Sequence, residues 1–263
     1  MRIGISQLIM GKTGCEDFFK QSAAAGYEVV EICMREEGEV TLEMTDDDAR
    51  RIVEQARAAG VEIVSMTHSH CTGNLLASGA AQQTSIEETI GGLKRAASMD
   101  IHYTLHVLGR MTPDLFYADA YDNAVASLKA IAPHAEKHDV ALAIEFVWNG
   151  FLFSPLEMRN LIDTVGSDHI GFYFDPGNMA VFQYPEHWVR ALGKRTKMVH
   201  LKDWQGHALN GDWTPLLEGE VDFPAVMAEL RAIGYDGPLI SEVPPKLAPL
   251  DATAKTARKL LGM

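Results

Sequence analysis

Short apolar segments alternate with longer amphipathic segments along the whole chain. An Ala-rich stretch, then Gly or a His-Asp pair, then an apolar run recurs at residues 23–32, 56–66, 135–146 and 230–243. Glycine commonly ends a helix in the left-handed conformation, and a continuous apolar run is typical of a strand buried on both faces. The repeated order of helix and strand therefore predicts βα units and a parallel sheet.

Eight apolar runs are candidate strands, and helical patterning occupies the segments that follow them. The strands are expected at residues 2–8, 27–33, 61–67, 102–108, 140–146, 169–174, 197–201 and 238–243. The helices are expected at residues 16–25, 45–59, 84–98, 115–138, 155–165, 185–193, 222–233 and 248–262. Eight βα units suit a chain of about 250 residues, the usual size of a TIM barrel. We therefore predict an α/β fold with a single (β/α)8 TIM-barrel domain over residues 1–263. A doubly wound open sheet is the alternative, although it usually has fewer strands.

The charge balance argues against a nucleic-acid partner. The 263 residues include 36 acidic and 23 basic side chains, which gives a formal net charge of −13. An acidic surface repels phosphate backbones, and no run of Lys or Arg in the chain exceeds two. A general nucleic-acid binder is therefore excluded, and the 47% hydrophobic and 22% charged residues are ordinary for a globular protein.

Cysteine usage and hydropathy bear on the cellular compartment. Cys15, Cys33 and Cys71 lie far apart without a CxxC pair, which disfavours a disulfide scaffold or a thiolate zinc site. The first apolar run is too short and too mixed for a secretory signal, and no window approaches 18 consecutive apolar residues. We expect a cytoplasmic protein without a membrane partner.

Polar side chains stand at the ends of the last four predicted strands. These residues are Glu145, Asp175, His200 and Glu242. The carboxyl ends of the strands meet at one rim of a TIM barrel, where the active sites of this fold lie. A buried carboxylate needs a compensating charge, and few cations are near in sequence. A bound divalent metal is the simplest partner for three carboxylates and one imidazole.

A single Glu or Asp at a strand end more often serves in an ion pair or a helix cap. Four such residues on consecutive strands instead favour a metal site. Three oxygen ligands and one nitrogen ligand, without a thiolate, suit Mn²⁺, Mg²⁺ or Co²⁺ better than structural Zn²⁺. We expect one divalent ion, with Mn²⁺ as the first choice.

The pattern AIEF…FDPGN…VHLKD…EGEVDF…GYDGPLISEV resembles the xylose-isomerase-like sugar isomerase/epimerase superfamily. Within it, the pattern is most similar to ketose 3-epimerases and pentulose-phosphate 3-epimerases. The resemblance implies that Glu145, Asp175, His200 and Glu242 bind the metal and that the two glutamates form the acid/base pair. It also implies a small carbohydrate substrate and a homo-oligomer.

The chemistry of such a reaction explains the need for two carboxylates. Removal of a proton beside a carbonyl develops a cis-enediolate, whose charge a bound metal stabilises. Epimerisation then requires protonation from the opposite face, so two bases must flank the carbon. We therefore expect a metal-dependent isomerase or epimerase of a ketose or keto-sugar, phosphorylated or not, with Glu145 and Glu242 as catalytic residues.

Further strand-end residues are candidates for contact with the substrate. They are His68, His70, His106, Asn178, Lys202 and Trp148. His68 and His70 are two positions apart, which would place both on one face of an extended segment. Each histidine can equally be a hydrogen-bonded residue of the rim, and Trp148 can stack on a sugar or simply pack. Asn178 stands where the resembled ketose epimerases often have His and the pentulose-phosphate epimerases have Asn.

Two departures from the resembled family disfavour a free ketohexose as the substrate. The ketohexose epimerases have an Arg a few residues beyond the strand-seven His, but residues 202–207 contain none. They also have a second Glu soon after the strand-five ligand, and residues 146–153 contain no acid. Gly206, Gly219 and Lys246 are candidates for holding a phosphate, because TIM barrels often bind phosphate in the last two loops.

Three other functions remain as alternatives. A lyase or dehydratase acting on a keto-sugar or keto-inositol would use the same metal and enolate chemistry. An endonuclease-IV-type DNA repair enzyme is disfavoured, because Asn178 replaces a zinc-binding His and the chain is acidic. A sugar-binding or scaffold protein is disfavoured because all four metal positions hold competent ligands.

Overall fold

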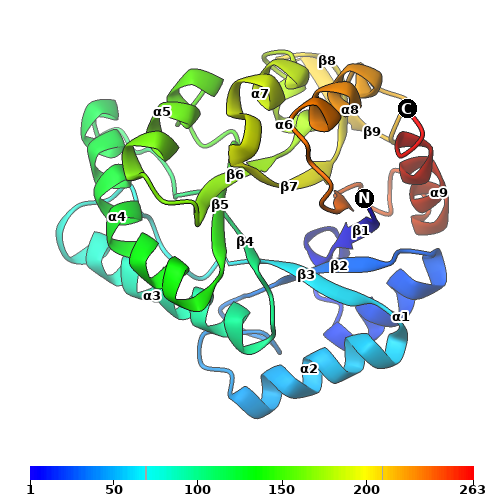
Figure 1. Ribbon diagram of the computed structural model, residues 1–263, viewed down its shortest axis with the longest axis horizontal. Helices are drawn as coiled ribbons and strands as arrows, with labels where there is room; N and C mark the ends of the chain where they lie inside the picture. Colours follow the sequence, from blue (N-terminus) through cyan, green and yellow to red (C-terminus); the bar gives the residue numbers. More distant parts are fainter. Residues whose placement is uncertain (69, 209) are drawn as a thin grey trace.

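The computed structural model describes residues 1–68, 70–208 and 210–263. In this part of the chain, eight parallel strands form a closed barrel in the spatial order β1-β10-β7-β6-β5-β4-β3-β2. The barrel strands are β1 (Ile3–Ser6), β2 (Val29–Cys33), β3 (Glu62–Thr67), β4 (Tyr103–His106), β5 (Ala141–Glu145), β6 (Ile170–Phe174), β7 (Thr196–Leu201) and β10 (Leu239–Ser241). The predicted (β/α)8 TIM barrel is confirmed, and Figure 1 shows the helices around the strands.

Helices follow the barrel strands in chain order and cover the outside of the barrel. The main helices are α1 (Cys15–Ala25), α2 (Asp46–Ala59), α3 (Gly79–Ser98), α4 (Tyr117–His138), α5 (Pro155–Val165), α7 (Pro185–Leu192), α8 (Phe223–Ala232) and α9 (Leu250–Leu260). Local signals define their ends. Thr45 and Asp48 form a reciprocal capping box at the start of α2, and Gly26 ends α1 with a φ of 92°.

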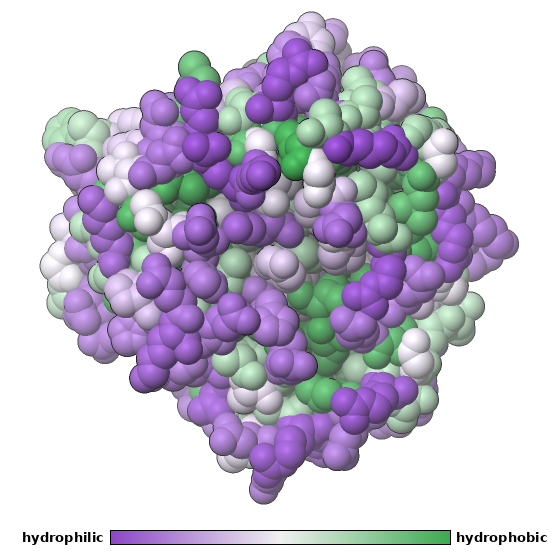
Figure 2. Space-filling model, viewed as in Figure 1, coloured by the Kyte–Doolittle hydropathy of each residue, from purple (hydrophilic) through white to green (hydrophobic). Residues whose placement is uncertain are grey.

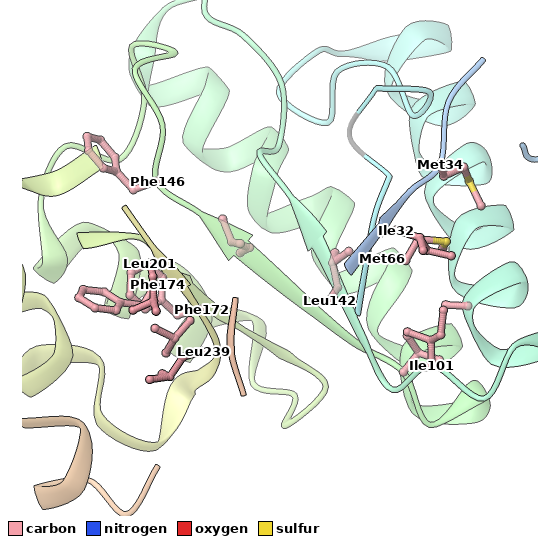
Figure 3. Packing of buried hydrophobic residues seen from close by; sticks show 14 of the residues in the cluster. Ile32, Met34, Met66, Ile101, Leu142, Phe146, Phe172, Phe174, Leu201 and Leu239 are labelled. Carbon is pink, nitrogen blue, oxygen red and sulfur yellow. The ribbon is translucent and has the colours of Figure 1, made fainter. Parts of the chain in front are cut away.

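Apolar side chains fill two separate regions of the core. The larger cluster lies between the strands and the helices and includes Ile32, Met66 and Phe172, as Figure 3 shows. The smaller cluster fills the barrel interior and comprises Val29, Leu105, Ala143, Tyr173, Met198 and Ile240. Gly4 is required inside the barrel, because a Cβ there would lie 2.5 Å from Ile240 Cδ1 and 2.8 Å from Val29 O. Packed side chains therefore fill the interior of the barrel below the carboxyl ends of the strands.

Several elements differ from the sequence-based expectation. A hairpin of β8 (Asp203–His207) and β9 (Asn210–Thr214) follows β7, and the short helix α6 (Pro176–Ala180) follows β6 directly. The first strand is shorter than predicted, because Ser6 caps the 3-10 helix η1 (Gln7–Met10). The hairpin and α6 both lie on the side of the barrel where the predicted site residues are found.

The surface of the molecule is mainly polar. Figure 2 shows hydrophilic residues over most of one face, with apolar residues between them. Trp148, Phe153 and Phe182 are among the exposed large apolar side chains, and Phe182 contacts the other two edge-on. No helix in the described part of the chain is long and apolar enough to span a membrane.

Candidate active site and metal centre

The four strand-end residues predicted to meet do converge. Glu145 is the last residue of β5, His200 lies in β7, and Asp175 and Glu242 follow β6 and β10 directly. One ligand atom from each of the four residues lies within 4.8 Å of the others. Asp175 and His200 are fully buried, and Glu145 is nearly so. We call these four residues the quartet.

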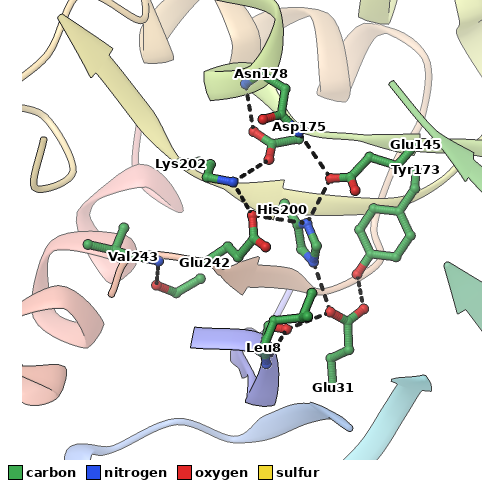
Figure 4. A network of polar contacts seen from close by, with 12 residues as sticks. Leu8, Glu31, Glu145, Tyr173, Asp175, Asn178, His200, Lys202, Glu242 and Val243 are labelled. Carbon is green, nitrogen blue, oxygen red and sulfur yellow. Dashed lines mark hydrogen bonds and ion pairs between the residues drawn. The ribbon is translucent and has the colours of Figure 1, made fainter. Parts of the chain in front are cut away.

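Close polar contacts connect the quartet (Figure 4). His200 Nδ1 lies 3.2 Å from Glu145 Oε1 and 3.8 Å from Glu242 Oε2. The ammonium of Lys202 lies 2.5 Å from Glu242 Oε2 and 3.5 Å from Asp175 Oδ2. One lysine and one histidine therefore face three carboxylates, of which Glu145 and Asp175 are buried and Glu242 is partly buried, so the site has an excess of negative charge.

The carboxylates of the quartet differ in proton affinity. Burial raises the pKa of Glu145 to about 7, although the hydrogen bond with His200 opposes this shift. Burial also raises the pKa of Asp175. Burial acts in the same direction on Glu242, but the charges of Lys202 and His200 outweigh it and lower the pKa of that carboxyl. Opposite shifts on two nearby carboxyls are typical of acid and base pairs.

The donor set of the quartet fits a divalent cation. Asp175 Oδ2 is buried and accepts no hydrogen bond from any residue that the structure describes. Carboxylate oxygens with one imidazole nitrogen suit Mn²⁺, Mg²⁺ or Co²⁺. A divalent ion would also offset two of the negative charges, whose burial is otherwise costly.

Asn178 and Lys202, predicted to contact the substrate, lie beside the quartet. The side-chain amide of Asn178 donates to Glu145 Oε1 at 3.4 Å and to Phe146 O at 3.2 Å. Its backbone N–H donates to Asp175 Oδ1 at 3.1 Å, which makes Asp175 the cap of α6. Asn178 therefore orients two members of the quartet at once.

Trp148 forms part of an aromatic wall next to the quartet. Its indole N–H donates to Asn178 O at 3.1 Å, and its ring stacks on Trp213 with centroids 5.1 Å apart and planes 7° apart. Trp213 lies on β9, and Lys202 Nζ lies 4.5 Å from the centroid of its ring. The sequence analysis missed Trp213, because it did not predict the hairpin.

His68 and His106 lie on the outer face of the barrel sheet, against α3. They are therefore not part of the site formed by the quartet. Their rings are 5.3 Å apart and meet edge-on. His106 Nε2 lies 2.8 Å from Thr72 Oγ1, and its Nδ1 accepts from Leu108 N at 2.8 Å. A Cβ at Gly92 of α3 would clash with the His68 ring. These contacts give both histidines a packing role between sheet and helix.

His70 differs from His68, although the two were expected on one face. Strand β3 ends at Thr67, so the alternation of a strand does not extend to His70. His70 lies in a turn and is exposed, whereas His68 is fully buried. The expected pairing of these two side chains is therefore wrong.

The buried histidines predict an acid-dependent loss of stability. Burial lowers the pKa of His106 to about 3, below the ordinary value near 6.5 of the unfolded chain. Below pH 6.5 the His106 imidazole is protonated in the unfolded state but not in the native state. The contribution of neutral His106 to the free energy of unfolding is therefore fully present above pH 6.5 and is lost as the pH falls towards 3. His106 alone should cost about 2 kcal/mol between pH 8 and pH 5.

Urea unfolding at pH 8 and pH 5 tests this prediction. The loss of unfolding free energy between the two pH values should be about 2 kcal/mol smaller in His106→Gln than in the wild type. The exposed His207→Gln variant is the control and should match the wild type. Equal pH dependence in the wild type and His106→Gln would contradict the prediction.

Glu31 is a residue near the quartet that the sequence analysis missed. It lies in the middle of β2 and is fully buried. Its Oε1 lies 2.9 Å from His200 Nε2, on the side of the ring opposite Nδ1. The signal in the sequence was a single acidic residue within the apolar run VVEIC.

The fold and the quartet together define a TIM-barrel protein with a candidate metal-dependent site at the carboxyl ends of its strands. The profile of the xylose isomerase-like TIM barrel family matches residues 19–261. The chain belongs to this family.

Individual relatives are distant. The "Probable L-ribulose-5-phosphate 3-epimerase UlaE" of Mycoplasma pneumoniae is 22% identical over 69% of this chain and 61% of its own. The chain spans less than two thirds of the length of the curated relatives it matches. A D-tagatose 3-epimerase-like protein of known crystal structure is 20% identical, with a TM-score of 0.83 over 100% of this chain and 97% of its own. The IOLI protein, crystallised with a zinc atom, is 15% identical, with a TM-score of 0.78 over 99% of this chain and 96% of its own.

Proposed function

We propose that this protein is a divalent-metal-dependent isomerase or epimerase that acts on a ketose or keto-sugar. The observation that carries the proposal is the convergence of Glu145, Asp175, His200 and Glu242 within 4.8 Å in a barrel of this family. The names of its relatives, a ribulose-phosphate epimerase and a tagatose-epimerase-like protein, support a sugar substrate. Mn²⁺ is the proposed metal, with Mg²⁺ or Co²⁺ as alternatives.

In this proposal, the quartet holds the metal, and Glu145 and Glu242 exchange protons with the substrate. The bound metal supplies positive charge for the oxyanion that develops when a proton leaves the carbon beside a carbonyl. Strands β6 and β7 separate β5 from β10 in the barrel, so the two glutamates approach the site from different sides. Their pKa values shift in opposite directions, which suits one proton donor and one acceptor.

A cavity next to Glu242 has room for the rest of the substrate. Its volume is about 500 Å³, within the usual range for small-molecule sites. Lys202 and Trp213 line the cavity beside the quartet. Lys246, which follows β10 in the chain, also lines the cavity. Lys246 would accommodate a phosphate, so phosphorylated and free ketoses both belong in the test.

Incubation with ketoses in deuterated water tests the proposed function. We expect solvent deuterium at the carbon next to the carbonyl in recovered or epimerised sugar, read by NMR and mass spectrometry. A chelator should abolish the exchange, and added Mn²⁺ should restore it. A shorter or unsaturated product would indicate a lyase or dehydratase instead. The proposal fails if the metal-loaded protein catalyses no exchange with any free or phosphorylated pentulose or hexulose.

A further inference from the structure

Glu31 is a charged residue placed inside the barrel rather than at its rim. Its carboxylate accepts hydrogen bonds from Ser6 Oγ at 2.8 Å, Ser65 Oγ at 2.8 Å and Tyr173 Oη at 2.6 Å. Its fourth contact is His200 Nε2 at 2.9 Å. These partners come from β1, β3, β6 and β7, so four other strands of the barrel hold this one side chain. Figure 4 shows the contacts of Glu31 with Tyr173 and His200.

The surroundings of Glu31 supply hydrogen-bond partners for a buried carboxylate. A fully buried carboxylate is costly unless such partners satisfy it. The hydroxyls of Ser6, Ser65 and Tyr173 occupy three hydrogen-bonding positions of the carboxylate, and His200 occupies a fourth.

The two nitrogens of His200 face different groups. Nε2 points to Glu31 Oε1, whereas Nδ1 points to Glu145 and Glu242. A carboxylate on one ring nitrogen favours the proton on that nitrogen and leaves the lone pair on the other. Because Nδ1 also faces carboxylates, it would give up its proton when a metal enters the quartet, whereas the contact with Glu31 would keep the other proton on Nε2.

We propose that Glu31 is a positioning residue that fixes the ring and tautomer of His200, so that His200 binds the metal through Nδ1. The inference rests on the proposed function, because it requires the quartet to hold a metal. Glu31 itself is not a ligand, since the three hydroxyls and the imidazole occupy its oxygens. A carboxylate behind a ligating histidine typically contributes about 10- to 100-fold to metal affinity.

Two substitutions separate this role from a purely structural one. Glu31→Gln keeps the size of the side chain and removes the charge that faces His200. Ser65→Ala removes one hydrogen bond to the same carboxylate and leaves the contact with His200 in place. Both variants lose a buried polar interaction inside the barrel, so a general effect of core disruption should appear in both.

Zn²⁺ affinity, measured by competition with a chelating dye at pH 7.5, is the first readout. Glu31→Gln should bind Zn²⁺ about 10- to 100-fold more weakly than the wild type, and Ser65→Ala within about threefold of it. Thermal unfolding without metal reports whether each variant folds. Equal losses in both variants, or wild-type affinity in Glu31→Gln, would overturn the inference.

Nitrogen-15 NMR of histidine-labelled, Zn²⁺-loaded wild-type protein is the second readout, and it does not depend on any variant. The His200 ring should show a protonated Nε2 and a metal-bound Nδ1. A metal-bound Nε2 would overturn the inference even if Glu31→Gln fails to fold. If the wild type binds no Zn²⁺, Mn²⁺ or Co²⁺, the metal centre of the proposed function fails as well, which is a different result from weak binding in Glu31→Gln alone.

Discussion

Glu145→Gln and Glu242→Gln should each reduce turnover by about 10²- to 10⁴-fold, the usual contribution of a general acid or base. Glutamine retains an oxygen that can ligate a metal, but it cannot accept the substrate proton at neutral pH. Turnover is therefore measured at saturating Mn²⁺, with the metal content of each variant determined in parallel. A fall in turnover at full metal occupancy assigns the loss to proton transfer.

The two variants should also differ in the epimer with which they lose deuterium exchange. If one glutamate serves each face of the carbon, Glu145→Gln should lose deuterium exchange with one epimer and keep it with the other. Glu242→Gln should show the reverse preference. Glu218→Gln, at an exposed position after β9, is the control and should match the wild type. Near-normal turnover in either active-site variant would contradict the assignment of that residue.

The sequence was sufficient to predict the barrel, because each βα unit carries its own local signals. Apolar runs mark the strands, and residues such as Gly26 and Gly60 end helices in the left-handed conformation. The hairpin of β8 and β9 lacks these signals. Its strands are largely polar, and Trp204 and Trp213 face each other across them. Such a pair is recognised only after the segment around it has folded.

The quartet was also predictable, because strand ends in a barrel meet at one rim and Glu145, Asp175 and Glu242 follow buried runs. The same reasoning overlooked Glu31, since it considered only the ends of the strands. It also misplaced His68. Ser65 of β3 points into the barrel, where it donates a hydrogen bond to Glu31. Side chains of a strand alternate between its two faces, and His68 is an odd number of residues beyond Ser65, so His68 points outward. The register of inward and outward positions requires the three-dimensional structure.

Asp175→Asn should abolish stable metal binding. Asp175 is fully buried, and its Oδ2 accepts no hydrogen bond from the described residues and lies 3.5 Å from Lys202 Nζ, so this oxygen remains available to coordinate a metal. Asparagine removes the negative charge but keeps a side-chain oxygen to cap α6 through the N–H of Asn178. The variant should therefore fold, and it should lack the metal found in the wild type.

Elemental analysis and thermal unfolding measure the effect. The wild type, purified without chelator, should carry about one metal ion per chain, and Mn²⁺ at about 100 times its Kd should stabilise it by about 2.7 kcal/mol. Asp175→Asn should carry less than about a tenth of an ion and gain no stability from the same Mn²⁺. Asp222→Asn makes the same change at the cap of α8, where Asp222 Oδ1 accepts from Ala225 N at 2.9 Å, and should retain its metal. Metal loss in Asp175→Asn alone would assign the binding to the quartet, whereas retention of metal by this variant would contradict the metal centre and the function built on it.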